Sequence, residues 1–193
     1  MKVVSELILN NETILFYPQF DEYGNLLTGV MEKHGTYLID MRPLDLIDYN
    51  LRYYGTSLEG ASAGTKMILG KIDMRPLVMN EKLGLYWFPS RSPSSEDCVW
   101  FALHHIKDYK SIGDKKTLVN FSNGSTIIMD ISFTSLDKKV QRAYKLKGKV
   151  EGRTSASASR VTESHNVYHL NKKSKSINYE INLLRREKEL KPR

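Results

Sequence analysis

The sequence predicts an α+β protein: a mainly antiparallel β-sheet built of meanders, with two or three helices. Short apolar runs separated by Asn, Gly, Pro and Ser recur through residues 3–130, which is the pattern of connected strands. Elsewhere the apolar residues recur every three or four positions, which indicates amphipathic helices. We expect these helices near residues 43–54, 134–148 and 176–190.

In the amino-terminal half, "VVSELIL" and "TILFYP" predict paired strands around Asn10-Asn11, and "DEYGN" predicts a further turn. The run "TYLIDM" is apolar enough for a buried strand. Pro43 suits the first position of the helix that follows, and Gly55 is well placed to end it. The next segment, "GTSLEGASAGT", predicts a glycine-rich connection, and it lacks the glycine motifs that cradle nucleotide phosphates.

Further strand-like pieces are "KMILGKI", "PLVM", "GLYWFP" and "CVWFAL". They precede Asn123-Gly124, whose sequence is typical of a type I′ turn and predicts a β-hairpin. Trp100 should face away from Phe101 on their strand, so an exposed Trp100 would indicate an interface. The predicted core comprises Trp87, Phe88, Val99, Phe101, Phe121, Ile127 and Met129.

Three regions follow from these patterns: a compact body at residues 1–150, a flexible, basic and Ser-rich linker at 151–175, and an amphipathic carboxy-terminal helix at 176–193. The helix has an apolar stripe, Ile177, Ile181 and Leu184, and is too short to be stable alone. The stripe is our candidate oligomerisation contact between subunits, with docking on the body of the same chain as the open alternative.

The charge is distributed unevenly along the chain. Residues 1–137 contain 13 Lys/Arg and 17 Asp/Glu, whereas residues 138–193 contain 16 Lys/Arg and 5 Asp/Glu. This asymmetry indicates a polyanion or an acidic protein surface as partner, and the alternative is a solvated lysine-rich tail. No apolar run approaches the roughly 18 residues that cross a bilayer. We therefore expect no membrane contact, and the single cysteine, Cys98, fits the cytoplasm.

An enzymatic reading is weak. Cys98 with His104 or His105 could form a thiol nucleophile, but "CVWFAL" is typical of a buried strand in which a small cysteine packs. The two adjacent histidines would point to opposite faces of a strand, which disfavours a shared metal. We expect no catalytic residue, no metal and no cofactor.

The predicted helix after the hairpin is dense in positive charge. On a helix Lys138, Arg142 and Lys145 fall along one side, away from the apolar stripe that begins at Leu136, and such a row suits phosphate contacts. A solvated helix face is the alternative. The candidate DNA-binding residues are Lys138, Lys139, Arg142, Lys145 and Lys147, with Arg52 and Lys107 as outlying contacts.

A succession of motifs across residues 36–147 resembles the ComK family, the competence transcription factors of Gram-positive bacteria. The pieces, in order, are Tyr53-Tyr54, Gly55-Thr56-Ser57, Gly60, Ala63-Gly64-Thr65, Pro76-Leu77-Val78, Phe88-Pro89, Cys98-Val99-Trp100, His105-Ile106-Lys107 and Phe121 to Gly124. After Gly60 the family pattern has an Arg-Lys pair, whereas this chain has Ala61 and Ser62. If that segment meets phosphate in relatives, two charges are missing here.

The resemblance implies a sequence-specific activator of competence (DNA-uptake) genes that binds paired AT-rich boxes in double-stranded DNA as a homodimer or tetramer. The narrow minor groove of AT-tracts attracts inserted Arg or Lys, which fits this chemistry. RNA polymerase, an adaptor and a AAA+ protease are further expected partners. The alternative function is an RNA-binding regulator that uses its basic and tyrosine surfaces, with Tyr53 and Tyr54 as stacking platforms.

Overall fold

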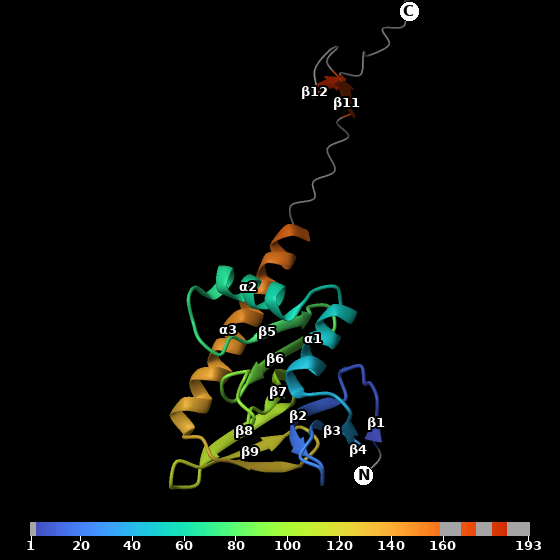
Figure 1. Ribbon diagram of the computed structural model, residues 1–193. Coiled ribbons are helices and arrows are strands. Elements are labelled where there is room, and N and C mark those ends of the chain that lie inside the picture. The colour runs from blue at the N-terminus through green and yellow to red at the C-terminus, as the bar shows by residue number, and fades with distance from the viewer. Residues whose placement is uncertain (1–2, 159–166, 173–178, 185–193) are drawn as a thin grey trace, which may run out of the picture. The chain divides into compact units, whose positions relative to one another are not determined.

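The computed structural model describes residues 3–158, 167–172 and 179–184, and the chain divides into two units, residues 1–154 and 155–193. The first unit contains a seven-stranded sheet in the order β1-β4-β3-β2-β7-β6-β5 and a three-stranded sheet in the order β10-β9-β8 (Figure 1). Neighbouring strands of both sheets are antiparallel except β1 and β4, which run parallel. The predicted α+β class of antiparallel meanders with helices is confirmed.

The amino-terminal elements are β1 (Val3–Val4), β2 (Thr13–Phe20), β3 (Leu26–Glu32), β4 (Gly35–Ile39), α1 (Pro43–Tyr53) and α2 (Leu58–Leu69). The central strands are β5 (Leu77–Asn80), β6 (Leu85–Pro89) and β7 (Trp100–Ala102), followed by the short 3-10 helix η1 (Leu103–His105). The remaining elements are β8 (Ile106–Ser111), β9 (Thr117–Phe121), β10 (Thr126–Met129), α3 (Phe133–Ala158), β11 (Val167–Lys172) and β12 (Tyr179–Leu184).

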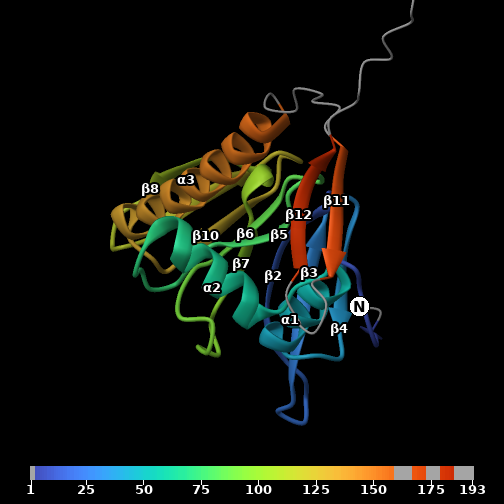
Figure 2. The same cartoon turned by 90° about the horizontal axis from the view of Figure 1, so that it is seen from above.

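The large sheet is buried on both faces, because successive side chains of its central strands enter two different apolar clusters. Trp87 and Trp100 pack in the cluster that includes the buried face of α1. Phe88 and Phe101 pack in the cluster that includes the buried face of α3. The two helices therefore cover opposite faces of the sheet (Figures 1 and 2).

The predicted core is confirmed with one exception. Trp87, Phe88, Val99, Phe101, Phe121 and Met129 are buried, whereas Ile127 is only half-buried. Trp100 does face away from Phe101, as predicted, but it is fully buried and forms no exposed interface.

The amino-terminal segment is organised by a buried side chain of α1. Asn50 accepts a hydrogen bond from the backbone N–H of Leu9 at 2.7 Å and donates one to the carbonyl of Leu7 at 3.0 Å. These hydrogen bonds tie the segment before β2 to α1, and this segment is not a strand. The predicted hairpin around Asn10-Asn11 is therefore wrong. Instead β1 pairs with β4, and β2 pairs with β3 and β7.

Helix α2 replaces the glycine-rich connection and much of the strand-like "KMILGKI" that the sequence predicted. The Ser57 hydroxyl caps it by accepting from the N–H of Gly60 at 3.1 Å, and Gly70 ends it with a φ of 84°. The hydroxyl of Thr65 donates to the Pro76 carbonyl at 2.7 Å, which ties the helix to the segment that enters β5. A cap and a tertiary contact thus outweigh the low helix propensity of two glycines.

The β9–β10 hairpin is confirmed, but its turn is not type I′. Within this fully described loop only Gly124 has a positive φ, 85°, and its N–H donates to the carbonyl of Phe121 at 3.0 Å. The Asn123 side chain accepts from the N–H of Ser125 at 3.0 Å. The loop is therefore the longer kind in which a type I turn is followed by a glycine bulge.

Two predictions for the carboxy-terminal region are wrong. Helix α3 continues through residues 151–158, and β11 occupies residues 167–172, both inside the range predicted as a flexible linker. Residues 179–184, predicted as part of a helix, form β12, which pairs antiparallel with β11. The apolar and polar residues of "INYEINL" alternate with the period of a strand. The structure follows this alternation and not the helical spacing of the apolar stripe.

Candidate nucleic-acid interface

Helix α3 presents one apolar face to the sheet and one charged face to solvent. Its buried, apolar face is formed by Leu136, Val140, Ala143 and Leu146. The helix runs past Gly148, because one glycine costs only about 1 kcal/mol relative to alanine in a helix interior. It therefore offers a long, rigid surface on the side away from the sheet.

Four basic residues follow that outer side at intervals of three or four positions. Lys138, Lys145 and Lys149 are exposed and Arg142 is half-buried, and we call these four residues the α3 basic row. At about 1.5 Å rise per residue the row spans roughly 16 Å, the length of about five base-pair steps. Lys149 was missing from the predicted site, although its position four residues after Lys145 could have identified it.

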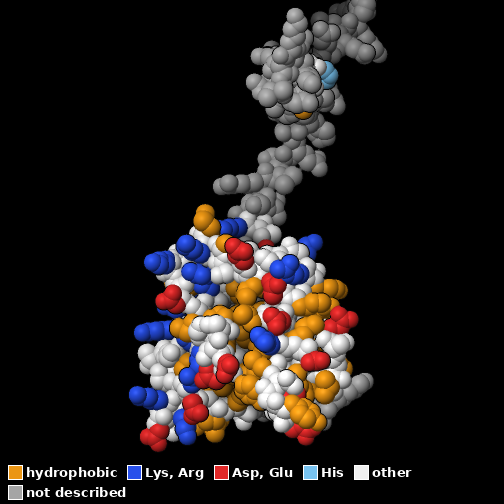
Figure 3. Space-filling view, viewed as in Figure 1, with side chains coloured by type: hydrophobic (Ala, Val, Ile, Leu, Met, Phe, Trp, Pro, Cys, Tyr) orange, Lys and Arg blue, Asp and Glu red, His pale blue; other side chains and the backbone are white. Residues whose placement is uncertain are grey.

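The acids of α3 lie away from the row. Asp137 accepts a hydrogen bond from the hydroxyl of Tyr109 on β8 at 2.7 Å. Glu151 pairs with Lys147, four residues before it, at 3.9 Å. No carboxylate of α3 therefore neutralises the row, and Figure 3 shows Lys and Arg side chains gathered along the side of the body where α3 lies in Figure 1.

Two members of the row contact α2 and the segment that joins α2 to β5. Arg142 Nη1 donates to the carbonyl of Asp73 at 3.4 Å, and Lys149 Nζ donates to the carbonyl of Ile68 at 3.1 Å. These contacts restrict both side chains, so less rotamer entropy is lost if they meet a phosphate. The exposed Lys66 of α2 and Lys71 just after it add two charges near this segment, and the sequence prediction had missed both.

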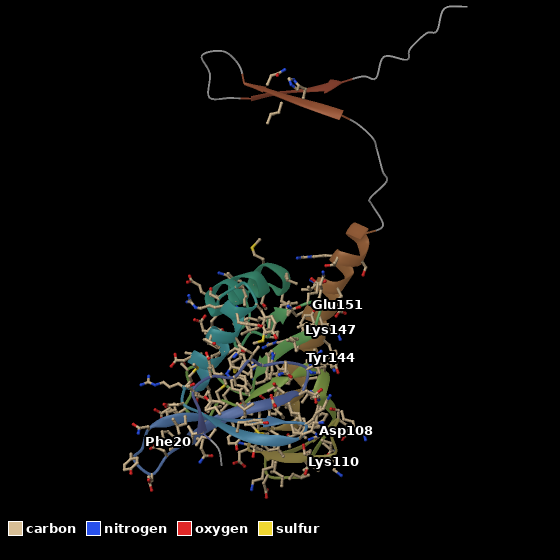
Figure 4. All side chains as sticks on the ribbon, turned by 90° about the vertical axis from the view of Figure 1, so that its right-hand side faces the viewer. Phe20, Asp108, Lys110, Tyr144, Lys147 and Glu151 are labelled. Carbon is tan, nitrogen blue, oxygen red and sulfur yellow. The ribbon has the colours of Figure 1, made fainter. Side chains whose placement is uncertain are left out.

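The structure separates Lys139 and Lys147 from the row. Lys139 is only 5% exposed, and its Nζ lies 3.3 Å from the Met74 sulfur. Burial lowers the pKa of Lys139, and the nearby charge of Arg142 lowers it further. Lys147 lies over the ring of Tyr86, 6.0 Å from its centroid, and Figure 4 shows it on the same flank of α3 as Tyr144 and Glu151.

The outlying candidates are not part of the row either. Arg52 lies on α1, on the opposite face of the large sheet, where its Nε contacts an Asp48 carboxylate oxygen at 2.7 Å. The hydrogen bond to that carboxylate raises the pKa of Arg52. The pKa of Asp48 is lowered, mainly by the hydrogen bond from the N–H of Leu58 and also by the one from Arg52. Lys107 is exposed on β8 of the smaller sheet. Only Lys138, Arg142 and Lys145 of the predicted contacts come together.

The segment after Gly60 is not an exposed loop in this chain. Ala61 packs partly against the cluster beneath α1, and the Ser62 hydroxyl accepts from Arg75 Nη1 at 3.0 Å. Both positions belong to α2, so their lack of charge leaves the α3 basic row unchanged.

The predicted oligomerisation residues are placed only in part. Ile177 lies outside the described residues. Ile181 and Leu184 are in β12, opposite Leu170 and Val167 of β11 in the backbone register. Their role in assembly stays a prediction.

Cys98 and His105, two residues of the enzymatic alternative, are both buried in the fold. Burial raises the pKa of the Cys98 thiol, which disfavours a nucleophilic thiolate. His105 is buried, with Nε2 2.9 Å from the Asn11 carbonyl and Nδ1 2.6 Å from the Ser122 hydroxyl, so both ring nitrogens are used. Within the described residues no group of three or more His, Cys, Asp or Glu side chains is arranged to hold a metal.

No helix in the described part of the chain is both long and apolar enough to cross a membrane. The fold and the α3 basic row together define a class, a basic α+β protein with a rigid cationic helix suited to a polyanion. A family model described as "ComK protein" matches residues 4–155, and the chain therefore belongs to the ComK family.

Among characterised relatives, the competence transcription factor of Bacillus subtilis (strain 168) is 29% identical over 145 residues, which covers 75% of each chain. No solved structure matches the chain.

Proposed function

We propose that this protein is a DNA-binding transcriptional activator of competence genes that acts in the cytoplasm and has no enzymatic activity. The observation that carries the proposal is the α3 basic row on a member of the ComK family. The row is rigid, unneutralised by the acids of its own helix, and long enough to contact several phosphates of one duplex.

The α3 basic row supplies the sequence-independent part of the binding, because phosphate contacts position a protein on DNA without reading bases. Paired AT-rich boxes would be recognised through the narrow minor groove, whose enhanced negative potential attracts an inserted guanidinium. Arg142 is the candidate reader, since it is the one arginine among the four residues of the row. Lys66 and Lys71 would extend the phosphate contacts beyond α3.

Paired boxes call for matched protein copies, so a homodimer or tetramer is part of the proposal. Deleting residues 176–193 should lower the mass of the assembly if this region joins subunits. An unchanged mass in a folded truncation would support docking within one chain. RNA polymerase, an adaptor and a AAA+ protease remain proposed partners on the strength of family membership alone.

A competition assay tests the proposal against its RNA-binding alternative. One observation favours that alternative: Tyr53 is 63% exposed and could stack on a base, although the Tyr54 hydroxyl is engaged with the Leu9 carbonyl at 2.9 Å. We expect an AT-box duplex to displace a labelled AT-box duplex better than a GC-rich duplex or single-stranded RNA does. Stronger competition by the RNA would overturn the proposal.

A further inference from the structure

A groove lies on the side of the large sheet opposite the main body of α3. Its volume is about 590 Å³, and its lining comes from α1, α2, β5, β7 and the segment that precedes β5. The apolar floor includes Leu44, Leu58, Leu77 and Trp100. A volume between about 300 and 1,000 Å³ is the usual range for sites that hold a compact ligand or side chain.

Two buried N–H groups in this lining lack a partner. Arg75 Nε and Trp100 Nε1 are buried and have no hydrogen-bond acceptor among the residues that the structure describes. Arg75 is nevertheless held in place, because its Nη1 donates to Ser62, another lining residue. Tyr86 Oη and Trp87 Nε1, which do not line the groove, are buried without a partner in the same way, and all four atoms are covered by the protein itself. The floor and the rim alone therefore indicate the occupant.

The rim of the groove is acidic. Asp45, Glu59 and Asp73 are exposed lining residues, and within the described part of the chain none of their carboxylates is engaged in an ion pair. Asp48, also in the lining, is already occupied by Arg52 and the N–H of Leu58. Figure 3 shows acidic side chains among exposed apolar ones on the front of the body, and a basic side chain also lies among them.

This combination identifies the chemistry of the occupant. A nucleic acid is repelled by three free carboxylates, and a purely apolar ligand would leave the charges of the rim without a partner. A protein segment satisfies both features, with an aliphatic side chain on the apolar floor and a Lys or Arg at the acidic rim. We propose that the groove is the docking site for a short basic–apolar segment of a protein partner.

The groove adjoins one end of the α3 basic row, because the carbonyl of its lining residue Asp73 accepts from Arg142 Nη1 at 3.4 Å. The inference nevertheless stands without the proposed DNA-binding function, because it is argued from the floor and rim of the groove alone.

Fluorescence anisotropy with the full-length protein and three labelled synthetic peptides tests the proposal. The first peptide contains leucine pairs flanked by lysines, the second replaces leucine by serine, and the third replaces lysine by glutamate. The first should bind at least about tenfold more tightly than either other peptide, since each contributes only part of the required chemistry. Its binding should also change the emission of Trp100, which is in the floor.

The variant Asp45→Lys/Glu59→Lys/Asp73→Lys should lose about tenfold in affinity for the leucine–lysine peptide, because three rim attractions become repulsions. All three residues are exposed, so folding should be retained, which circular dichroism can verify. A matched variant, Glu22→Lys/Glu81→Lys/Asp114→Lys, introduces the same charge outside the groove and should bind like the wild type.

Three results would overturn the proposal: no binding of the leucine–lysine peptide, equal binding of all three peptides, or the same loss in both charge-reversed variants.

Discussion

Replacing Lys139 by methionine should stabilise the protein. The Lys139 side chain is 5% exposed, and its ammonium group donates to the sulfur of Met74, which is a weak acceptor. Methionine has nearly the same volume and needs no hydrogen bond, so the packing should be kept. Removing the desolvated charge and its repulsion by Arg142 should raise the free energy of unfolding by about 1 kcal/mol at neutral pH.

The effect has a definite pH dependence. Burial lowers the pKa of Lys139 below its ordinary value of 10.5. Between the folded and unfolded pKa values the unfolded chain therefore binds more protons than the folded chain. The wild type should therefore gain stability as the pH rises toward about 10.5, and this Lys139 contribution should be absent in the variant. The gap between the two proteins should narrow on the alkaline side.

Urea unfolding followed by circular dichroism from pH 7 to pH 10 measures both effects. Lys138→Met is the matched control, because Lys138 is its exposed neighbour on α3 and should change stability by less than about 0.5 kcal/mol. A loss of more than about 1 kcal/mol in Lys139→Met would refute the reasoning, since it would show that the ammonium makes a net stabilising contact. The salt dependence of DNA binding should be the same in Lys139→Met and wild type.

Three further predictions concern the fold. Asn50→Leu leaves the backbone groups of Leu9 and Leu7 unpaired in a buried setting and should cost about 3 kcal/mol or more in urea unfolding; a cost under about 1 kcal/mol would contradict the structural role of Asn50. Gly124→Ala should cost about 1 kcal/mol, because Gly124 has a φ of 85°, and an unchanged melting midpoint would argue against the glycine bulge. Burial lowers the pKa of His105, so the unfolded chain binds its proton first and the free energy of unfolding should fall as the pH drops below about 6.5. His105→Gln should reduce that slope, and an equal slope in both proteins would count against the buried neutral imidazole.

Local patterns predicted α1 and most of the core. Pro43 and Gly55 bracket the helix, and the structure starts α1 at Pro43 and ends it at Tyr53. The alternation around Trp100 and Phe101 correctly separated the two faces of the sheet. These features depend on neighbours in sequence, so one sequence is enough to recognise them.

Features that depend on distant residues could not be predicted in this way. The pairing of β1 with β4 is accompanied by hydrogen bonds from the amino-terminal segment to Asn50, more than 40 residues away. Helix α2 contains Gly60 and Gly64, and its tie through Thr65 to Pro76 is visible only in three dimensions.

In the candidate site, too, the features set by the local sequence were predicted and those set by distant residues were not. The helical period correctly grouped Lys138, Arg142 and Lys145 on one side of α3. The same period also placed Lys139 close to the apolar stripe, so its burial could have been predicted from its position between Leu136 and Val140. Only the structure shows that Arg52 lies on the far face of the sheet and that Lys147 lies over the Tyr86 ring.

The central claim is that the α3 basic row contacts DNA phosphates, and the salt dependence of DNA binding tests it most directly. Lys138 and Lys145 are exposed members of the row, whereas Arg42 and Lys82 are exposed basic residues outside α3 that serve as a matched control. In Lys138→Gln/Lys145→Gln the slope of log affinity against log salt should become shallower by about 1.8, or about 0.9 for each lost phosphate contact, on AT-box and random duplexes alike. Arg42→Gln/Lys82→Gln should keep the wild-type slope. An unchanged slope in the α3 variant, or an equal change in the control, would contradict the account.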